Sequence, residues 1–142
     1  MEKLKLDLEQ LNNATKTLYN AFGVMQEARE MGHQGFIFAA EDSIIQRFEY
    51  SYEMFWKFLK RYLELVHQLK DMHSSRKVFY ASVKMEVCSL EEGSIFIDMV
   101  DSRNETSHTY SIEASRIILS DVPRYYAAMI AVVKRFNTKL GK

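Results

Sequence analysis

An arginine, a histidine and a tyrosine lie within eight residues of one another, at Arg103, His108 and Tyr110. Arginine binds phosphate through forked, charge-assisted hydrogen bonds. Histidine exchanges protons near neutral pH, so it can act as a general acid or base. Together, these residue types indicate chemistry at a phosphate group.

Whether the three side chains can meet depends on the backbone between them. At about 100° per residue, Arg103 and Tyr110 share one face of an unbroken helix, whereas Arg103 and His108 diverge by roughly 140°. All three converge only if the helix ends or turns between them. Residues 104–109 are polar, and Asn, Ser and Thr favour helix ends, so such a break is expected here. The alternative is that Arg103 forms a salt bridge at a helix end while His108 and Tyr110 only pack.

Other kinds of site are not indicated. The remaining histidines do not have the four-residue spacing that places two ligands on one helix face, and the chain has one cysteine, Cys88. No glycine-rich phosphate loop and no GxSxG nucleophile elbow occurs. We therefore expect no metal site and no cofactor.

Composition limits the fold and the location of the protein. The chain has 142 residues, 19 basic and 19 acidic, with five glycines and one proline. This length predicts one domain over residues 1–142, and sparse glycine and proline argue against a β-sandwich or barrel. No signal-peptide block occurs, and the longest strongly apolar run, residues 127–133, is too short to span a bilayer. We expect a soluble, cytoplasmic protein without a membrane partner.

Helical periodicity runs through most of the chain. Apolar residues at alternating four- and three-residue steps predict amphipathic helices over residues 4–25, 44–69 and 122–140. The second of these helices has the widest apolar face, so we expect it at the centre of the bundle. A shorter helix is expected over residues 76–90, a turn with an N-cap over residues 91–94, and two apolar helical turns over residues 95–100. Residues 101–111 have no apolar period of their own. Pro123 either begins the last helix or kinks a longer one that begins near Ser111. The predicted fold is an all-α, antiparallel up-and-down bundle of about five helices.

Two separated motifs resemble one known family. Arg103-Asn104, followed by Thr106-Ser107-His108-Thr109-Tyr110, is similar to the arginine, four residues, histidine, any residue, tyrosine signature of HEPN domains. Residues 45–64 resemble a hallmark helix of one HEPN branch, the nucleotidyltransferase substrate-binding protein family. The resemblance covers essentially the whole chain. It departs from the family pattern at Ser75, where a proline is common, and at Phe96, where a tryptophan is common.

The resemblance implies a function. Such proteins form dimers of all-α bundles and act with a minimal nucleotidyltransferase. In many pairs the HEPN member is a metal-independent ribonuclease toxin and the nucleotidyltransferase is its antitoxin. By position, Arg103 and His108 would be the catalytic pair, Asn104 would support them, and Tyr110 would be the residue that the partner modifies with AMP.

Two other interpretations stay open. In one, the chain is a non-catalytic subunit whose groove beside Arg103 and Tyr110 holds a nucleotide or another acceptor for the nucleotidyltransferase; in the other, the motif only holds a dimer together. Local charge bears on the choice, because residues 86–105 carry a net charge of −5 and residues 111–142 a net charge of +4. An acidic segment is a poor track for RNA unless the basic C-terminal helix lies beside it.

Overall fold

The computed structural model consists of five α-helices and a short π-helical turn. It describes residues 1–108 and 112–141, without the side chains of residues 105–108 and 112–114. The elements are α1 (Glu2–Met31), α2 (Gln34–Val66), α3 (Ser75–Lys84), α4 (Leu90–His108), α5 (Ile112–Phe136) and η1 (Asn137–Gly141). The residues that the structure describes contain no strand, and the predicted all-α bundle of about five helices is confirmed.

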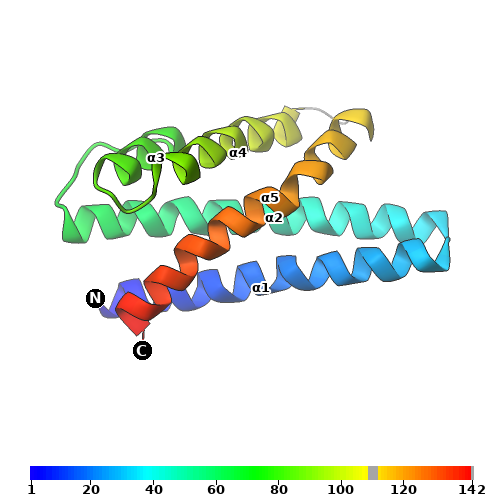
Figure 1. Cartoon of the computed structure of the whole chain (residues 1–142), viewed down its shortest axis with the longest axis horizontal. Helices are drawn as coiled ribbons and strands as arrows, with labels where there is room; N and C mark the ends of the chain where they lie inside the picture. The colour runs from blue at the N-terminus through cyan, green and yellow to red at the C-terminus, as the bar shows by residue number, and fades with distance from the viewer. Residues whose placement is uncertain (109–111, 142) are drawn as a thin grey trace.

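The two longest helices form an antiparallel hairpin (Figure 1). Gly32 ends α1 in the left-handed region, at φ 70°, where glycine is tolerated without strain, and its N–H is directed at the carbonyls of Ala28 and Arg29. His33 then caps α2, since its Nδ1 accepts a hydrogen bond from the N–H of Phe36 at 3.3 Å. The turn predicted at the two glycines is confirmed.

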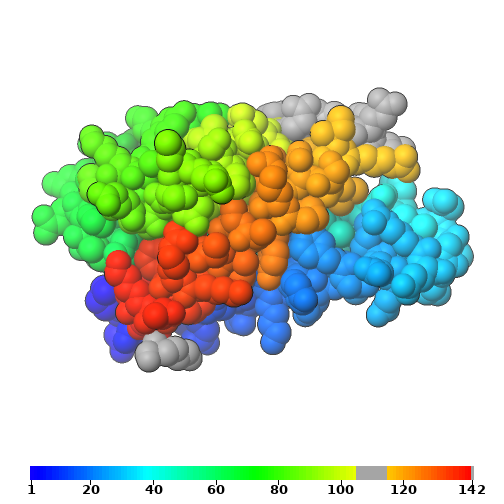
Figure 2. All heavy atoms as spheres, in the orientation of Figure 1, coloured from blue at the N-terminus to red at the C-terminus, as the bar shows by residue number. Residues whose placement is uncertain are grey.

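The remaining helices cover one side of this hairpin. α5 crosses the pair diagonally and contacts α1, α2 and α4, while α3 contacts α2 and α4 (Figure 1). The predicted central place of α2 is confirmed, because it packs against α1, α3 and α5. Five of its aromatic residues are buried in the core: Phe48, Tyr52, Phe55, Phe58 and Tyr62. In Figure 2 the far end of the α1–α2 hairpin projects beyond the atoms of α5.

The connection between α3 and α4 differs from the prediction. α3 ends at Lys84 rather than near residue 90, and Glu86 adopts a left-handed conformation at φ 60°. The predicted turn at residues 91–94 is the first turn of α4. Ser89 and Glu92 form a reciprocal capping box there: the Glu92 N–H donates to Ser89 Oγ at 3.0 Å and the Ser89 N–H donates to Glu92 Oε1 at 2.9 Å.

The polar segment is helical over residues 101–108, although it has no apolar period of its own: α4 continues to His108, and α5 begins at Ile112. Pro123 lies inside α5, as the longer-helix alternative predicted. No helix in the described ranges is long and apolar enough to cross a membrane.

Candidate functional site

Arg103 lies near the end of α4 and faces the central helix. Its Nη2 is 3.8 Å from Oε2 of Glu53 on α2, and 28% of its side chain is exposed. Glu53 also lies 3.4 Å from the ammonium group of Lys57, one turn further along α2. The carboxylate of Glu53 therefore lies between two cations. Part of the Arg103 side chain stays open to solvent.

A buried tyrosine anchors α4 at the residue before Arg103. The hydroxyl groups of Ser102 and Tyr125 are 2.7 Å apart, and the Tyr125 hydroxyl also donates to the carbonyl of Asp98 at 3.4 Å. The ring of Tyr125 stacks on Phe48 with centroids 5.6 Å apart. Burial raises the pKa of Tyr125, and the hydrogen bond to Ser102 opposes this. These contacts fix α4 against α5 and α2 at the position of the motif.

A second polar contact joins α3 to the same part of α4. Arg76 Nη2 donates to Oδ1 of Asp101 at 2.7 Å, two residues before Arg103. The neighbouring Ser75 hydroxyl hydrogen-bonds the hydroxyl of Tyr52, the residue before Glu53. Burial raises the pKa of Tyr52, while Arg103 and Arg76 act in the opposite direction. Both guanidinium groups thus act on one buried hydroxyl at the junction of α2, α3 and α4.

The other motif residues are located only in part. Asn104 is exposed. The backbone of α4 runs without a break from Arg103 and ends at His108, so the helix end expected within residues 104–109 does not separate Arg103 from His108. The side chain of His108 and all of Tyr110 lie outside the described residues. The structure therefore places Arg103 and the helix that leads to His108.

The acidic segment before the motif forms ion pairs with basic residues of other helices. The basic C-terminal helix does lie alongside α4. Arg124 lies 3.4 Å from Asp98, and Arg135 lies 2.7 Å from Glu92, where it lowers the pKa of that carboxyl. With Arg76 on Asp101, bases from α3 and α5 pair with three acids of α4. The segment around the motif is accordingly less acidic than its sequence suggests.

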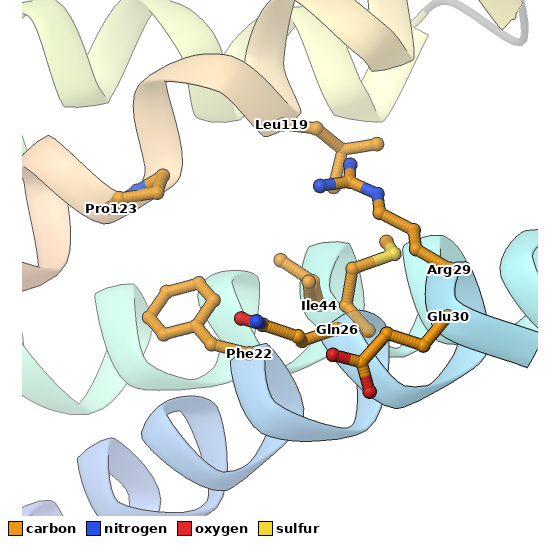
Figure 3. Close-up of a pocket in the computed structure, with 8 residues that line it drawn as sticks. Phe22, Gln26, Arg29, Glu30, Ile44, Leu119 and Pro123 are labelled. Carbon is orange, nitrogen blue, oxygen red and sulfur yellow. The ribbon is translucent and has the colours of Figure 1, made fainter.

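A groove lies apart from the motif, where α5 diverges from the α1–α2 hairpin (Figure 3). Its volume is about 710 Å³. Leu119 and Pro123 of α5 face Phe22 and Ile44 across it, and Arg29 and Glu30 lie at one side. Arg103 and Asn104 do not line it. Within the described chain, no group of three or more His, Cys, Asp or Glu side chains could hold a metal ion.

Sequence reasoning missed the partners of Arg103 and its neighbours. Glu53 lies within the hallmark helix, but in the sequence it appears only as half of a four-residue ion pair with Lys57. Arg76 and Tyr125 are separated from their partners by 25 and 23 residues. No local pattern indicates either pairing.

Comparisons with known proteins give the family and the fold of the chain. The model of the family described as "Nucleotidyltransferase substrate binding protein like" matches residues 6–140. A crystal structure of a protein from Thermus thermophilus is similar, with a TM-score of 0.69 and 30% identity, covering 86% of this chain and 97% of that one. A tri-AMPylated HEPN toxin of Shewanella oneidensis, solved in complex with MNT antitoxin, shares the fold, with a TM-score of 0.68 and 19% identity, covering 90% of this chain and 96% of that one. No curated protein matches the chain.

Proposed function

This chain belongs to the nucleotidyltransferase substrate binding protein like family, and we propose that it acts with a minimal nucleotidyltransferase in a toxin–antitoxin-type pair. Two findings support the proposal. The family description refers to nucleotidyltransferases, and a HEPN toxin of the same fold occurs in complex with MNT antitoxin. The sequence resemblance to HEPN domains pointed to the same partnership.

Within this pair, the chain acts as a metal-independent endoribonuclease. The 2′-hydroxyl of RNA attacks the adjacent phosphorus and the bond to the 5′-oxygen breaks. His108 accepts the proton of the 2′-hydroxyl or delivers a proton to the leaving 5′-oxygen, and each such transfer contributes about 10²–10⁴-fold. Arg103 stabilises the negative charge that develops on the phosphoryl oxygens, and Asn104 supports the site.

The placement of Arg103 carries this proposal. The carboxylate of Glu53, from another helix, lies 3.8 Å from its guanidinium, and its side chain stays partly open to solvent. Because α4 is continuous from Arg103 to His108, these two positions of one chain face about 140° apart, and the site needs a second copy of the motif. An arginine placed in this way can offer its exposed N–H donors to a phosphate.

The proposed enzyme is a homodimer. One chain supplies one motif histidine, whereas the reaction needs one group to take a proton and another to give one. A two-fold axis that brings the two motifs together supplies a histidine for each step.

Nucleotidylation of Tyr110 silences this activity. The tyrosine oxygen attacks the α-phosphorus of ATP and pyrophosphate leaves, which places AMP on the side chain. The added phosphate carries negative charge beside the motif, where it competes with RNA for Arg103 and blocks access to His108. The AMPylated state of the similar HEPN toxin supports this step.

Co-expression with the partner nucleotidyltransferase tests the pairing and the modification together. We expect the two proteins to co-purify, and the intact mass of this chain to rise by one or more AMP units. Tyr110→Phe should abolish the first addition, whereas Tyr19→Phe, which changes a tyrosine that is 60% exposed on α1, should not. An unmodified chain, or equal modification of Tyr110→Phe, would contradict the silencing step.

A binding subunit is the second candidate, and the groove between α1, α2 and α5 favours it. A volume of about 710 Å³ suits a nucleotide-sized ligand, with Phe22 offering a ring and Arg29 a cation. Calorimetry with ATP tests this alternative. Nucleotide binding that Arg29→Ala abolishes, in a chain that leaves RNA intact over long incubation, would favour the binding subunit over the ribonuclease.

A further inference from the structure

The first turn of α3 lies directly beside the motif. Arg76 bonds Asp101 at 2.7 Å, and Asp101 precedes Arg103 by two residues on α4. Ser75, the residue before Arg76, bonds Tyr52, and Tyr52 precedes Glu53, the partner of Arg103. Two independent contacts therefore bind the start of α3 to residues that lie close in sequence to Arg103 and to its partner Glu53.

Arg76 is available to a ligand in a way that a buried structural arginine is not. Its side chain is 40% exposed, and its partner Asp101 is 65% exposed. A guanidinium has five N–H donors, more than one carboxylate oxygen can satisfy. The adjacent Lys77 is exposed as well, and the N-terminus of α3 adds a positive partial charge on this side. Arg76 and Lys77 together outweigh the negative charge of Asp101, so the first turn of α3 carries a net positive charge beside α4.

An aromatic side chain continues this edge. Tyr80 follows Arg76 by four residues, so both lie on the same face of α3. Tyr80 is 58% exposed. Its neighbours Val78 and Phe79, by contrast, are buried in the core. Packing explains those two residues but not an exposed tyrosine beside an exposed arginine.

From these contacts we propose that Arg76 and Tyr80 form a single-stranded RNA-binding surface that extends the Arg103 site along α3. Arg76 binds a backbone phosphate next to the one at Arg103, and Tyr80 stacks on a base. Single-stranded nucleic acids are commonly bound by this combination of a cationic backbone contact and an aromatic platform. The inference rests on the proposed ribonuclease function for its ligand and adds to it the residues that hold RNA without reacting with it.

The salt dependence of RNA binding tests this surface. Fluorescence anisotropy of a short labelled oligouridylate would be measured from low to moderate salt, with all proteins in a His108→Ala background so that the RNA stays intact. Each phosphate contact to a single strand contributes about 0.7 to the slope of log K against log salt. We expect Arg76→Ala to weaken binding about tenfold and to reduce the magnitude of that slope by about 0.7. Tyr80→Ala should weaken binding about tenfold without changing the slope, because stacking releases no counterion.

Two further variants separate RNA binding from folding. Arg61→Ala is the matched control, because Arg61 is 44% exposed and forms a 2.7 Å pair with Asp7 on the α1 side of α2. It should leave both affinity and slope unchanged. Asp101→Asn removes a negative charge beside the proposed phosphate and should tighten RNA binding. A loss of binding in Asp101→Asn as large as that in Arg76→Ala would mean that the ion pair only supports the fold, and would overturn the proposal.

The outcomes also separate this surface from the ribonuclease activity. If Arg76→Ala keeps the parent slope while RNA cleavage by the His108-containing enzyme continues, the surface is wrong and the proposed function stands. If Arg76→Ala lowers the slope as expected but the His108-containing chain leaves RNA intact, the surface stands and the ribonuclease function fails.

Discussion

The guanidinium of Arg103 and the carboxylate of Glu53 lie 3.8 Å apart and connect α4 to the central helix. The ammonium group of Lys57 lies 3.4 Å from the same carboxylate, so Glu53 is shared between two cations. The contact links the most regular element of the sequence, α2, to its least regular segment. The position of the motif therefore depends on the central helix, which begins at Gln34, about ten residues before the apolar pattern that predicted it.

Removal of this carboxylate should impair RNA cleavage more than stability. In Glu53→Gln, Arg103 loses its charged partner and samples other rotamers, and small displacements of a catalytic group have large effects on rate. We expect an approximately tenfold decrease in the cleavage rate, with partial recovery in Glu53→Asp. The free energy of unfolding should fall by less than about 1 kcal/mol, because the pair is partly exposed. Glu64→Gln, at an exposed position further along α2, is the control and should change neither quantity.

Gly93 should be sensitive to the addition of a single methyl group. A Cβ atom at this buried position would lie 2.3 Å from Cγ2 of Val83, so α3 and α4 approach closely here. We expect Gly93→Ala to lower the free energy of unfolding by about 1–3 kcal/mol in urea titrations. Val83→Ala combined with Gly93→Ala should cost less than the two single changes together.

A second glycine provides the opposite case. Gly23 lies within α1, and nothing is within 4 Å of a Cβ built there. Gly23→Ala should stabilise the protein by about 0.5–1 kcal/mol, because alanine favours helix and glycine does not. Similar effects of the two substitutions would contradict the described packing of α3 on α4.

The thiol of Cys88 should be unreactive in the folded protein. Burial raises the pKa of Cys88 to about 12, the carboxylate of Glu92 adds to this effect, and Arg135 opposes it. Between pH 9 and 12 the folded protein therefore keeps the thiol proton. The unfolded chain releases this proton with the ordinary pKa of 9.0. This contribution to stability is full below pH 9 and is lost as the pH rises above it, by at most about 1.4 kcal/mol per unit.

Thiol labelling and urea titration check this prediction. A disulfide reagent at pH 8 should modify Cys88 only after denaturation. Between pH 9 and 10 the free energy of unfolding should decline more steeply in the parent than in Cys88→Ala. Rapid labelling of the native protein would show that the thiol is accessible, contrary to its buried position.

Sequence periodicity predicted α1 and α2 because their apolar residues keep one helical rhythm over many turns. It failed where tertiary contacts decide the structure. Glu91–Ser94 resembles a turn, yet Glu92 completes a capping box with Ser89, and Gly93 serves the close approach of α3. Residues 101–103 have no apolar period, yet Asp101 and Ser102 are held by Arg76 and Tyr125 from distant segments.

The candidate site, too, could be predicted from the sequence only in part. The spacing of Arg103, His108 and Tyr110 was visible in the sequence and indicated their chemistry. The ion pair between Arg103 and Glu53 was not visible, because Glu53 lies on another helix and no sequence motif links the two residues. Local sequence therefore indicated the reactive residue types, whereas the fold supplied their partners.

RNA cleavage in the presence of EDTA by the unmodified chain and by His108→Ala is the most direct test of the proposed ribonuclease. We predict metal-independent cleavage that is lost by at least about 10²-fold in His108→Ala, with the helical circular dichroism and the melting temperature unchanged. Equal cleavage rates for the two proteins, or intact RNA with both, would contradict it.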